Sequence, residues 1–248
     1  MNSLVDVYCI SYNKPKRKQQ MEYIFAKLDI PAYMYAGVGP EDPRMQEHPW
    51  ISSCMLGHMD MVAKFYYESD KEYGIICEDD ICIHDKLPDH IPVIIEECKK
   101  RDIDLVMLGY LMNYHIPHNG SNGHQFICDL TTHTGYTGHR MYTYTDDLWG
   151  GQMYMISKTY AKELVEKYGL EYGIAWNNAL TNNIQNHNYI CYVADFINTK
   201  VTPKRAVVYH PLCIENGDVD HYEHYGQRMF HKASYTMHVN EHFVGSYM

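Results

Sequence analysis

Three adjacent carboxylates, Glu78, Asp79 and Asp80, stand inside a stretch that otherwise resembles a buried strand, GIICEDDICIH at residues 74–84. Adjacent acids repel one another, and a hard divalent cation among them offsets that repulsion. Mg²⁺ and Mn²⁺ prefer carboxylate and water oxygens, and they need only one or two protein carboxylates when a substrate phosphate supplies further ligands. The triplet therefore predicts part of a metal site. The alternative is an ordinary acidic turn at the end of a strand.

Strand and helix patterns alternate ahead of the triplet. Residues 4–10, LVDVYCI, favour a strand, and the polar turn SYNKPKRK follows. Met21, Ile24 and Phe25 then recur at helical spacing, and AYMYAGV predicts a second strand. A strand, a helix and another strand in this order are typical of a parallel sheet covered by helices.

The same order recurs around the triplet. A helix over about residues 53–67 leads to the strand YGIIC, which runs directly into the acids, and the helical spacing of residues 91–98 precedes the buried strand DLVMLGY. WGGQMYMIS, another amphipathic helix, and the strand candidates YICYVA and AVVYH follow. We predict an α/β fold with a central, mostly parallel sheet flanked by helices. The carboxylates then lie at the C-terminal end of a central strand, where open α/β sheets keep their ligand crevice.

Two segments break this rhythm. Residues 110–147 are rich in His, Asn, Gly, Thr and Tyr, which is typical of a lid, a binding loop or a small hairpin excursion. Among these we favour a loop that becomes ordered when a ligand binds. Residues 215–248 are rich in histidine and poor in aliphatic side chains. We therefore expect a main domain at residues 1–214 and a C-terminal extension at 215–248 that packs on it or is partly disordered.

Composition excludes several classes of protein. The formal net charge of −10 argues against a nucleic-acid partner, which would ordinarily need a basic surface. No apolar run is long enough to span a bilayer, and the N-terminus, MNSLVDVYCISYN, lacks the features of a signal peptide. The eight cysteines form no C-x-x-C pair, and most lie in apolar segments. A reducing compartment, the cytoplasm, is the expectation, or the host cytoplasm if the source is viral.

Three stretches of the sequence resemble a known family. They are VYCISYNKPKRKQQMEYIFAKLDIPAYMYAGV, CMLGHMDMVAKFYYESDKEYGIICEDDICI and LWGGQMYMISKTYAKELVEKYG, and they cover roughly residues 4–168. The sequence is similar here to glycosyltransferase family 25, which includes bacterial lipopolysaccharide galactosyltransferases, animal collagen galactosyltransferases and enzymes of large DNA viruses. Gly57 replaces the serine that the family has before His58, and Asn177 and Asn178 stand where the family usually has an acidic residue.

The resemblance implies a GT-A type glycosyltransferase, in which one nucleotide-binding α/β domain uses an activated sugar and usually Mn²⁺. A nucleotide-diphosphate sugar, first of all a UDP-sugar, is then the donor, and a glycan or glycoprotein hydroxyl is the acceptor. The diphosphate leaving group develops negative charge as the glycosidic bond breaks, and a cation held by carboxylates stabilises that charge without a proton transfer. The acids would thus lie at a strand end to meet a pyrophosphate.

Individual residues receive roles within this scheme. We expect Asp80 to be the most direct ligand of Mn²⁺ or Mg²⁺, with Asp79 or Glu78 contacting the metal, metal-bound water, the ribose or nearby backbone. Tyr12, Asn13 and Arg17, at the end of the first strand, are candidates for binding the nucleotide base, ribose and phosphates; the alternative is a solvated basic turn.

A further metal ligand is sought in His210, at the end of the strand candidate AVVYH, although a structural histidine is the alternative. Asp146 and Asp147 precede Trp149 and are candidates for the acceptor side. If the reaction inverts the anomeric centre, a carboxylate must accept the proton of the attacking hydroxyl, and Asp147 is the preferred candidate over Asp146. A capping role for these acids is the alternative.

Two other classes of function remain open at the level of sequence. One is a nucleotide-sugar-binding module without catalytic activity, which the two asparagines at 177 and 178 make worth testing. The other is a metal-dependent phosphoesterase or nucleotidyltransferase, for which a set of Asp and His residues at 218–224 could supply further ligands. The sugar, the nucleotide base, the acceptor and the oligomeric state do not follow from the sequence.

Overall fold

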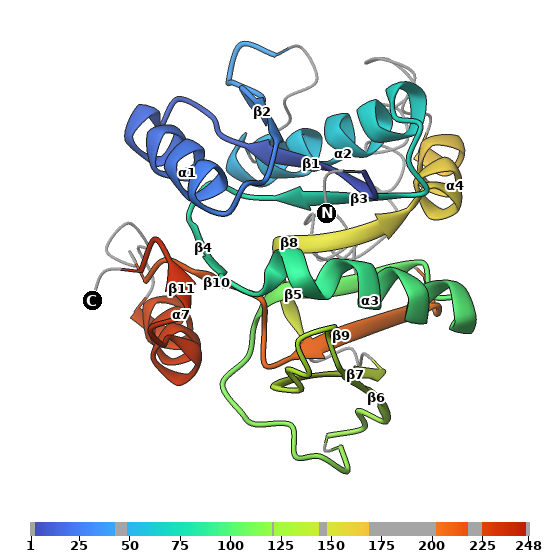
Figure 1. The fold of residues 1–248 in the computed structure, drawn as a ribbon. Helices are drawn as coiled ribbons and strands as arrows, with labels where there is room; N and C mark the ends of the chain where they lie inside the picture. The colour runs from blue at the N-terminus through green and yellow to red at the C-terminus, as the bar shows by residue number, and fades with distance from the viewer. Residues whose placement is uncertain are drawn as a thin grey trace.

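A computed structural model describes residues 3–42, 49–120, 122–143, 148–168, 202–217 and 225–246 of the chain (Figure 1). Helices and strands alternate along its first part, as the sequence patterns predict. In chain order the elements are β1 (Val5–Ile10), α1 (Pro15–Lys27), β2 (Ala32–Tyr35), α2 (Pro49–Glu68), β3 (Tyr73–Cys77), β4 (Ile81–His84), α3 (Leu87–Arg101), β5 (Leu105–Leu111), β6 (Phe126–Leu130), β7 (His139–Thr143), β8 (Trp149–Ser157), α4 (Lys158–Tyr168), β9 (Arg205–Tyr209), β10 (Cys213–Glu215), α7 (Tyr225–His238) and β11 (Phe243–Val244).

The strands of these described segments form one 11-stranded sheet. Its main path is β11-β4-β10-β5-β8-β3-β1-β2, while β9 pairs with β5 and β7, and β6 pairs with β7. The pairings give eight strands one direction, and only β4, β7 and β8 the other. The sheet is therefore mixed but mostly parallel, which confirms the predicted fold class.

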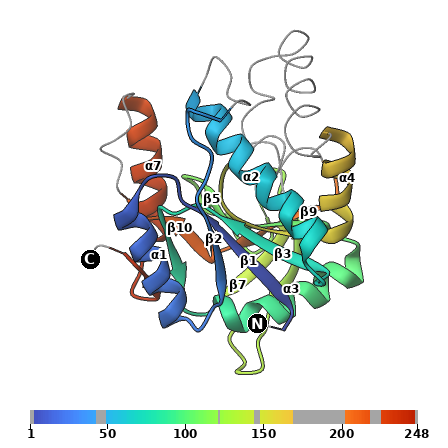
Figure 2. The same cartoon turned by 90° about the horizontal axis from the view of Figure 1, so that it is seen from above.

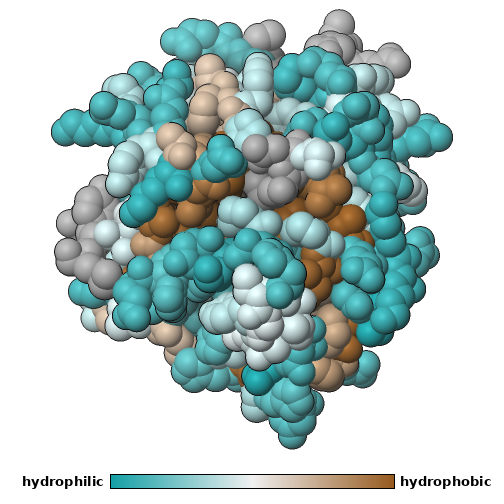
Figure 3. Space-filling view, viewed as in Figure 1, coloured by the Kyte–Doolittle hydropathy of each residue, from teal (hydrophilic) through white to brown (hydrophobic). Residues whose placement is uncertain are grey.

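Helices cover both faces of the sheet (Figure 2). On one face α1 and α3 bury apolar side chains such as Met21, Ile24 and Ile94 against the sheet, and on the other α2 and α4 bury Met59 and Leu164. Each helix turns its apolar stripe inward because burial of that stripe removes apolar surface from water. Hydrophilic residues cover most of the face seen in Figure 3, with apolar residues gathered near its middle.

The register of the central strands positions the acidic triplet. β1 and β3 run parallel, and Cys9 is the partner of Cys77 at their carboxyl ends. The residues that follow each strand, Ser11 onward after β1 and Glu78 onward after β3, therefore leave the sheet at the same edge. Because ligand crevices of α/β sheets lie at the carboxyl ends of their strands, this edge is where a binding site is expected.

The segment 110–147 contains a hairpin. β6 and β7 pair antiparallel, and β7 also pairs with β9, so that Met141 and Tyr142 are fully buried. The hairpin excursion is the correct alternative for this part of the segment, and the preferred one, a loop, is wrong here. The reason is that Phe126 and Ile127 of β6 and Tyr142 and Thr143 of β7 favour strands, although the residues around them are rich in His, Asn and Gly. That the segment becomes ordered on ligand binding stays a prediction.

The described part of the C-terminal segment lies against the same sheet. β10 pairs with β4 and β5, and β11 pairs with β4. Phe243 packs with Cys82 and Ile214, and Tyr235 of α7 packs against them. Across the residues that the structure describes, no helix has the length and apolar character needed to cross a membrane.

Candidate active site

Arg17 joins the ends of β1 and β3. Its Nη1 lies 2.9 Å from Asp80 Oδ2 and 3.6 Å from Asp79 Oδ1. The arginine belongs to the first turn of α1, directly after the loop that leaves β1, while the two acids directly follow β3. The structure thus brings together Arg17, Asp79 and Asp80, three of the residues that the sequence selects as a site.

The first turn of α1 is strongly basic. The helix begins at Pro15, which is suited to a first turn because its missing N–H would have no helical partner there, and no acidic residue occupies this turn. Lys16, Arg17 and Lys18 instead stand at the helix N-terminus, where the helix dipole disfavours cations. An anion bound at this N-terminus would offset that cost, since free backbone N–H groups and the dipole both favour negative charge.

The two aspartates lie in a crowded acidic environment. Burial raises the pKa of Asp80 well above its ordinary value, and the charges of Glu78, Glu215 and Asp79 raise it further, while Arg17 opposes them. Burial also raises the pKa of Asp79. Its Oδ2 atom is buried without a hydrogen-bond partner among the described residues. The carboxyl groups here therefore carry more negative charge, and more oxygens that could bind a metal, than Arg17 alone can pair.

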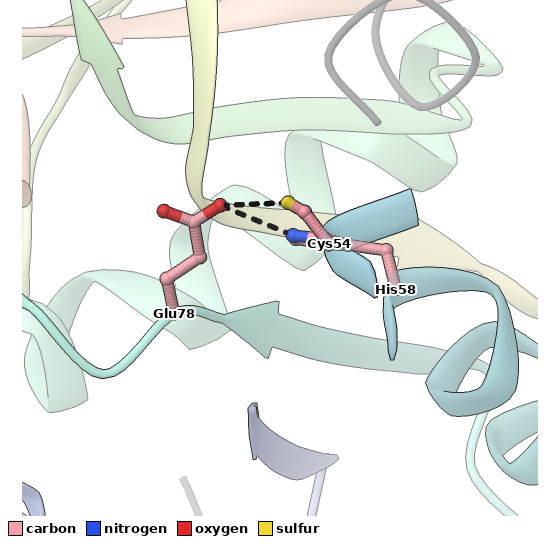
Figure 4. A group of neighbouring side chains, drawn as sticks. All are labelled: Cys54, His58 and Glu78. Carbon is pink, nitrogen blue, oxygen red and sulfur yellow. Dashed lines mark hydrogen bonds and ion pairs between the residues drawn. The ribbon is translucent and has the colours of Figure 1, made fainter. Parts of the chain in front are cut away.

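Glu78 faces a different element from its two neighbours. Its Oε1 lies 3.3 Å from Nε2 of His58 and 3.6 Å from Sγ of Cys54, both on α2 (Figure 4). His58 Nδ1 in turn lies 3.1 Å from the hydroxyl of Tyr154. Burial acts to raise the pKa of Glu78, but His58, Cys54 and Arg17 outweigh it and lower the pKa. The triplet is therefore divided, with Glu78 toward α2 and the aspartates toward α1.

Glu215 is an acid of this region that sequence reasoning missed. It ends β10 opposite Ile81, and Nδ1 of the buried His231 lies 2.5 Å from its Oε2. The N–H of Asn216 donates a 2.7 Å hydrogen bond to the carbonyl of Asp80. One sequence signal could have revealed Glu215. In CIE, residues 213–215, an acidic residue directly follows a short apolar run, as it does in the triplet. The pairing of β10 with β4 does not follow from that pattern.

A surface pocket of about 340 Å³ adjoins the basic turn. It lies at the carboxyl ends of β1 and β2, and its lining residues are Ser11, Asn13, Lys14, Pro15, Lys18, Met34, Tyr35 and Ala36. Tyr12 lies beside it and packs closely on Gly37, where an added Cβ would come within 2.7 Å of the Tyr12 Cβ. Asn13 takes a left-handed conformation, with φ of 47°. Both candidates thus lie at the predicted edge.

The remaining candidates are not drawn into this group. His139 Nδ1 lies 2.8 Å from the carbonyl of His210, whose ring stacks on Tyr209. Burial, His115 and Arg140 lower the pKa of His210, so its charged neighbours are basic. Its role as a metal ligand stays a prediction that this geometry does not support. Asp146 and Asp147 lie outside the described residues, as do the strand candidate at 189–194, Asn177 and Asn178, and the acidic and histidine set at 218–224.

The fold is that of an α/β protein in which a basic helix N-terminus and clustered carboxylates meet at one edge of the sheet. The sequence model of glycosyltransferase family 25, described as a lipopolysaccharide biosynthesis protein family, matches residues 51–176. That match spans more than half of the 248 residues, and it contains α2 except for its first two residues, the triplet and β8. The chain belongs to glycosyltransferase family 25 and is therefore a transferase, as the resemblance implies.

Solved structures give weaker similarities. "A197 from STIV" is 11% identical, with 71% of this chain and 76% of that chain covered and a TM-score of 0.39. A mannose-1-phosphate geranyltransferase from Thermus thermophilus is 10% identical, with 82% and 73% covered and a TM-score of 0.40. None of the curated proteins compared with the chain matches it.

Proposed function

We propose that this family 25 member transfers a hexose from a nucleotide-diphosphate sugar, with a UDP-sugar as the first candidate, to a hydroxyl of a glycan or glycoprotein, with help from Mn²⁺ or Mg²⁺. One observation carries the proposal beyond family membership. A basic helix N-terminus and a pair of aspartates, joined by Arg17, meet at the carboxyl edge of the sheet. A diphosphate is the ligand that uses both, because it has negative charge for the helix and oxygens for a metal.

The donor set suits a hard cation. Asp79 has a buried oxygen without a partner among the described residues, and the carboxyls around Asp80 carry more negative charge than Arg17 offsets. Asp80 and Asp79 would hold the ion, consistent with the preference of Mn²⁺ and Mg²⁺ for a few carboxylates plus phosphate oxygens. When bound, the ion would stabilise the negative charge of the departing diphosphate.

Different residues of the chain would bind the remaining parts of the donor, the phosphates and the nucleoside. The N-terminus of α1, with Lys14 and Lys18 beside it, would bind the phosphates, and Arg17 would hold Asp80 in place. The pocket bordered by Asn13 and Tyr35 is large enough for a nucleoside. Tyr12 supplies an exposed aromatic ring at its margin, suited to a flat base.

The acceptor side is proposed from sequence alone. If the anomeric centre is inverted, a carboxylate near the acceptor must take the proton of the attacking hydroxyl, and Asp147 is our candidate, with Asp146 as the second choice. Both precede β8, whose Gln152 carbonyl accepts a 3.1 Å hydrogen bond from the N–H of Glu78. This adjacency connects the β8 end with the triplet.

A donor screen tests the proposal. Thermal unfolding of the full chain is measured with a panel of nucleotide sugars, each with and without Mn²⁺, because a ligand at about 100 times its Kd stabilises a protein by about 2.7 kcal/mol. We expect stabilisation by one nucleotide class that requires the metal, and its loss in Asp80→Asn but not in Asp89→Asn, a matched change on α3. If no nucleotide sugar stabilises the chain, or if Asp80→Asn responds like wild type, the donor site lies elsewhere.

Release of free sugar and nucleotide separates this function from its rivals. A transferase should hydrolyse its donor slowly when Mn²⁺ is present and acceptor is absent. A binding module without activity would show stabilisation only. A phosphoesterase would cleave phosphate esters and leave the glycosidic bond intact.

A further inference from the structure

We propose that Cys54, His58 and Glu78 form a second metal site, for a zinc-type cation, separate from the oxygen site at Asp79 and Asp80. Among the described residues these three form a group whose potential ligand atoms all lie within 4.8 Å of one another (Figure 4). The site does not depend on the proposed donor or reaction, because it is argued from its own ligand atoms.

The helix and the strand converge to make this group. Cys54 and His58 are four residues apart on α2, so their side chains lie one turn apart on the same face of the helix. Glu78 directly follows β3 and turns toward that face. Three ligands from two rigid elements are therefore held in a fixed relation, which a metal site needs.

Two of the three distances between ligand atoms match the edges of a tetrahedral zinc site, and the third lies within 4.8 Å. With metal-to-ligand bonds of about 2.3 Å to sulfur and about 2.0–2.2 Å to nitrogen and oxygen, tetrahedral geometry separates a nitrogen from an oxygen by about 3.4 Å and a sulfur from an oxygen by about 3.6 Å. The corresponding separations are 3.3 Å between His58 Nε2 and Glu78 Oε1, and 3.6 Å between Cys54 Sγ and the same oxygen.

The histidine is oriented as a ligand. Its Nδ1 faces the Tyr154 hydroxyl at 3.1 Å, and the two rings are stacked with centroids 5.7 Å apart. Nε2 is therefore the nitrogen that faces the group. Partners of this kind on the second ring nitrogen fix the tautomer and orientation of metal-binding histidines.

The ligand types select the metal. One thiolate, one imidazole and one carboxylate suit Zn²⁺, whereas Mn²⁺ and Mg²⁺ prefer oxygen ligands. His58 is buried, while Cys54 is exposed, so the group opens to solvent on the cysteine side and can accept an ion there. Three protein ligands leave a fourth position for water. An ion at this position would link α2 to the residues after β3, which include Asp79 and Asp80.

Metal uptake by the full chain tests the site. The chain is stripped with a chelator, returned to metal-free buffer without donor or Mn²⁺, and titrated with Zn²⁺ by calorimetry and with Co²⁺ by absorption spectroscopy. We expect one Zn²⁺ per chain, a sulfur-to-cobalt charge-transfer band, and a loss of affinity of at least about tenfold in Cys54→Ser and in His58→Gln. Cys128→Ser and His118→Gln, changes of the same types on or beside β6, should bind zinc as wild type does.

The proposed site would be overturned if the wild-type chain bound no zinc, or if Cys54→Ser and Cys128→Ser bound zinc with the same affinity. A hydrogen-bonded group without a metal gives that result. Because His58 is buried, His58→Gln could fail to fold, and circular dichroism of the metal-free variants is recorded first; Cys54→Ser, at an exposed position, then carries the test. The titration contains no donor, so its failure would leave the proposed transfer reaction intact.

Discussion

Acid should destabilise this protein through buried histidines. His84, His90, His139 and His238 are each at most 4% exposed. Burial, as the largest cause, lowers the pKa from the ordinary 6.5 to about 3 for His84 and to about 4 for the other three. The folded state thus holds neutral rings that the unfolded chain would protonate. This stability is fully present above pH 6.5 and is lost as the pH falls from 6.5 toward 4.

His90 allows the effect of one ring to be measured. It is 0% exposed, neither ring nitrogen has a hydrogen-bond partner among the described residues, and its ring contacts that of His139, with centroids 4.8 Å apart. With a pKa of about 4 in the folded state and 6.5 in the unfolded chain, one histidine lowers the free energy of unfolding by about 2 kcal/mol between pH 7 and pH 5. His90→Leu, similar in volume, should remove that cost.

Urea unfolding at pH 7 and pH 5 gives the measurement. We expect His90→Leu to be at least as stable as wild type at pH 7, because it removes two buried nitrogens without partners. Its loss of stability between pH 7 and pH 5 should be smaller than that of wild type by about 2 kcal/mol. His118→Leu, at a side chain that is 61% exposed, should behave as wild type. Equal losses in wild type and His90→Leu would refute the assignment of a depressed pKa to His90.

Three further predictions concern the donor and acceptor sides. Arg17→Ala should weaken nucleotide binding about tenfold in calorimetry without unfolding the protein, since it removes the charge-assisted hydrogen bond that would hold Asp80 in place, worth about 1.5 kcal/mol or more; an unchanged Kd would exclude Arg17 from the site. Gly37→Ala should lower nucleotide affinity, because φ of +70° strains an alanine and its Cβ displaces Tyr12; wild-type affinity would show that the Tyr12 ring does not contact the base. Asp147→Asn should reduce transfer to acceptor in a product assay far more than it changes donor Kd, and normal transfer would require another base.

Local patterns predicted the layers of the fold because each layer has its own period. The spacing of Met21, Ile24 and Phe25 identifies α1, and all three are buried. The unbroken apolar run before Glu78 identifies β3 as a strand buried on both faces, which also places the acids at a sheet edge. Composition misled at β6 and β7, because the His, Asn and Gly residues of the segment hid the two short strands FICDL and HRMYT that pair as a hairpin.

The direction of each acid could not be predicted from the triplet. Three adjacent residues at a strand end can face either layer of helices, and only the packing of α1 and α2 on opposite faces sends Asp80 to Arg17 and Glu78 to His58. Glu215 reaches the site through the pairing of β10 with β4, a contact between residues that lie far apart in the sequence. Such long-range pairings depend on topology, which local patterns do not encode.

Turnover measures the central claim most directly. Donor hydrolysis and transfer by wild type, Asp80→Asn and Asp89→Asn are followed with Mn²⁺, and again after chelation. We predict that wild type and Asp89→Asn require the metal and that Asp80→Asn, although folded, loses most metal-dependent turnover, because the cation would lose its most direct carboxylate ligand. Wild-type turnover by Asp80→Asn with Mn²⁺ would contradict the account of this sheet edge as the donor site.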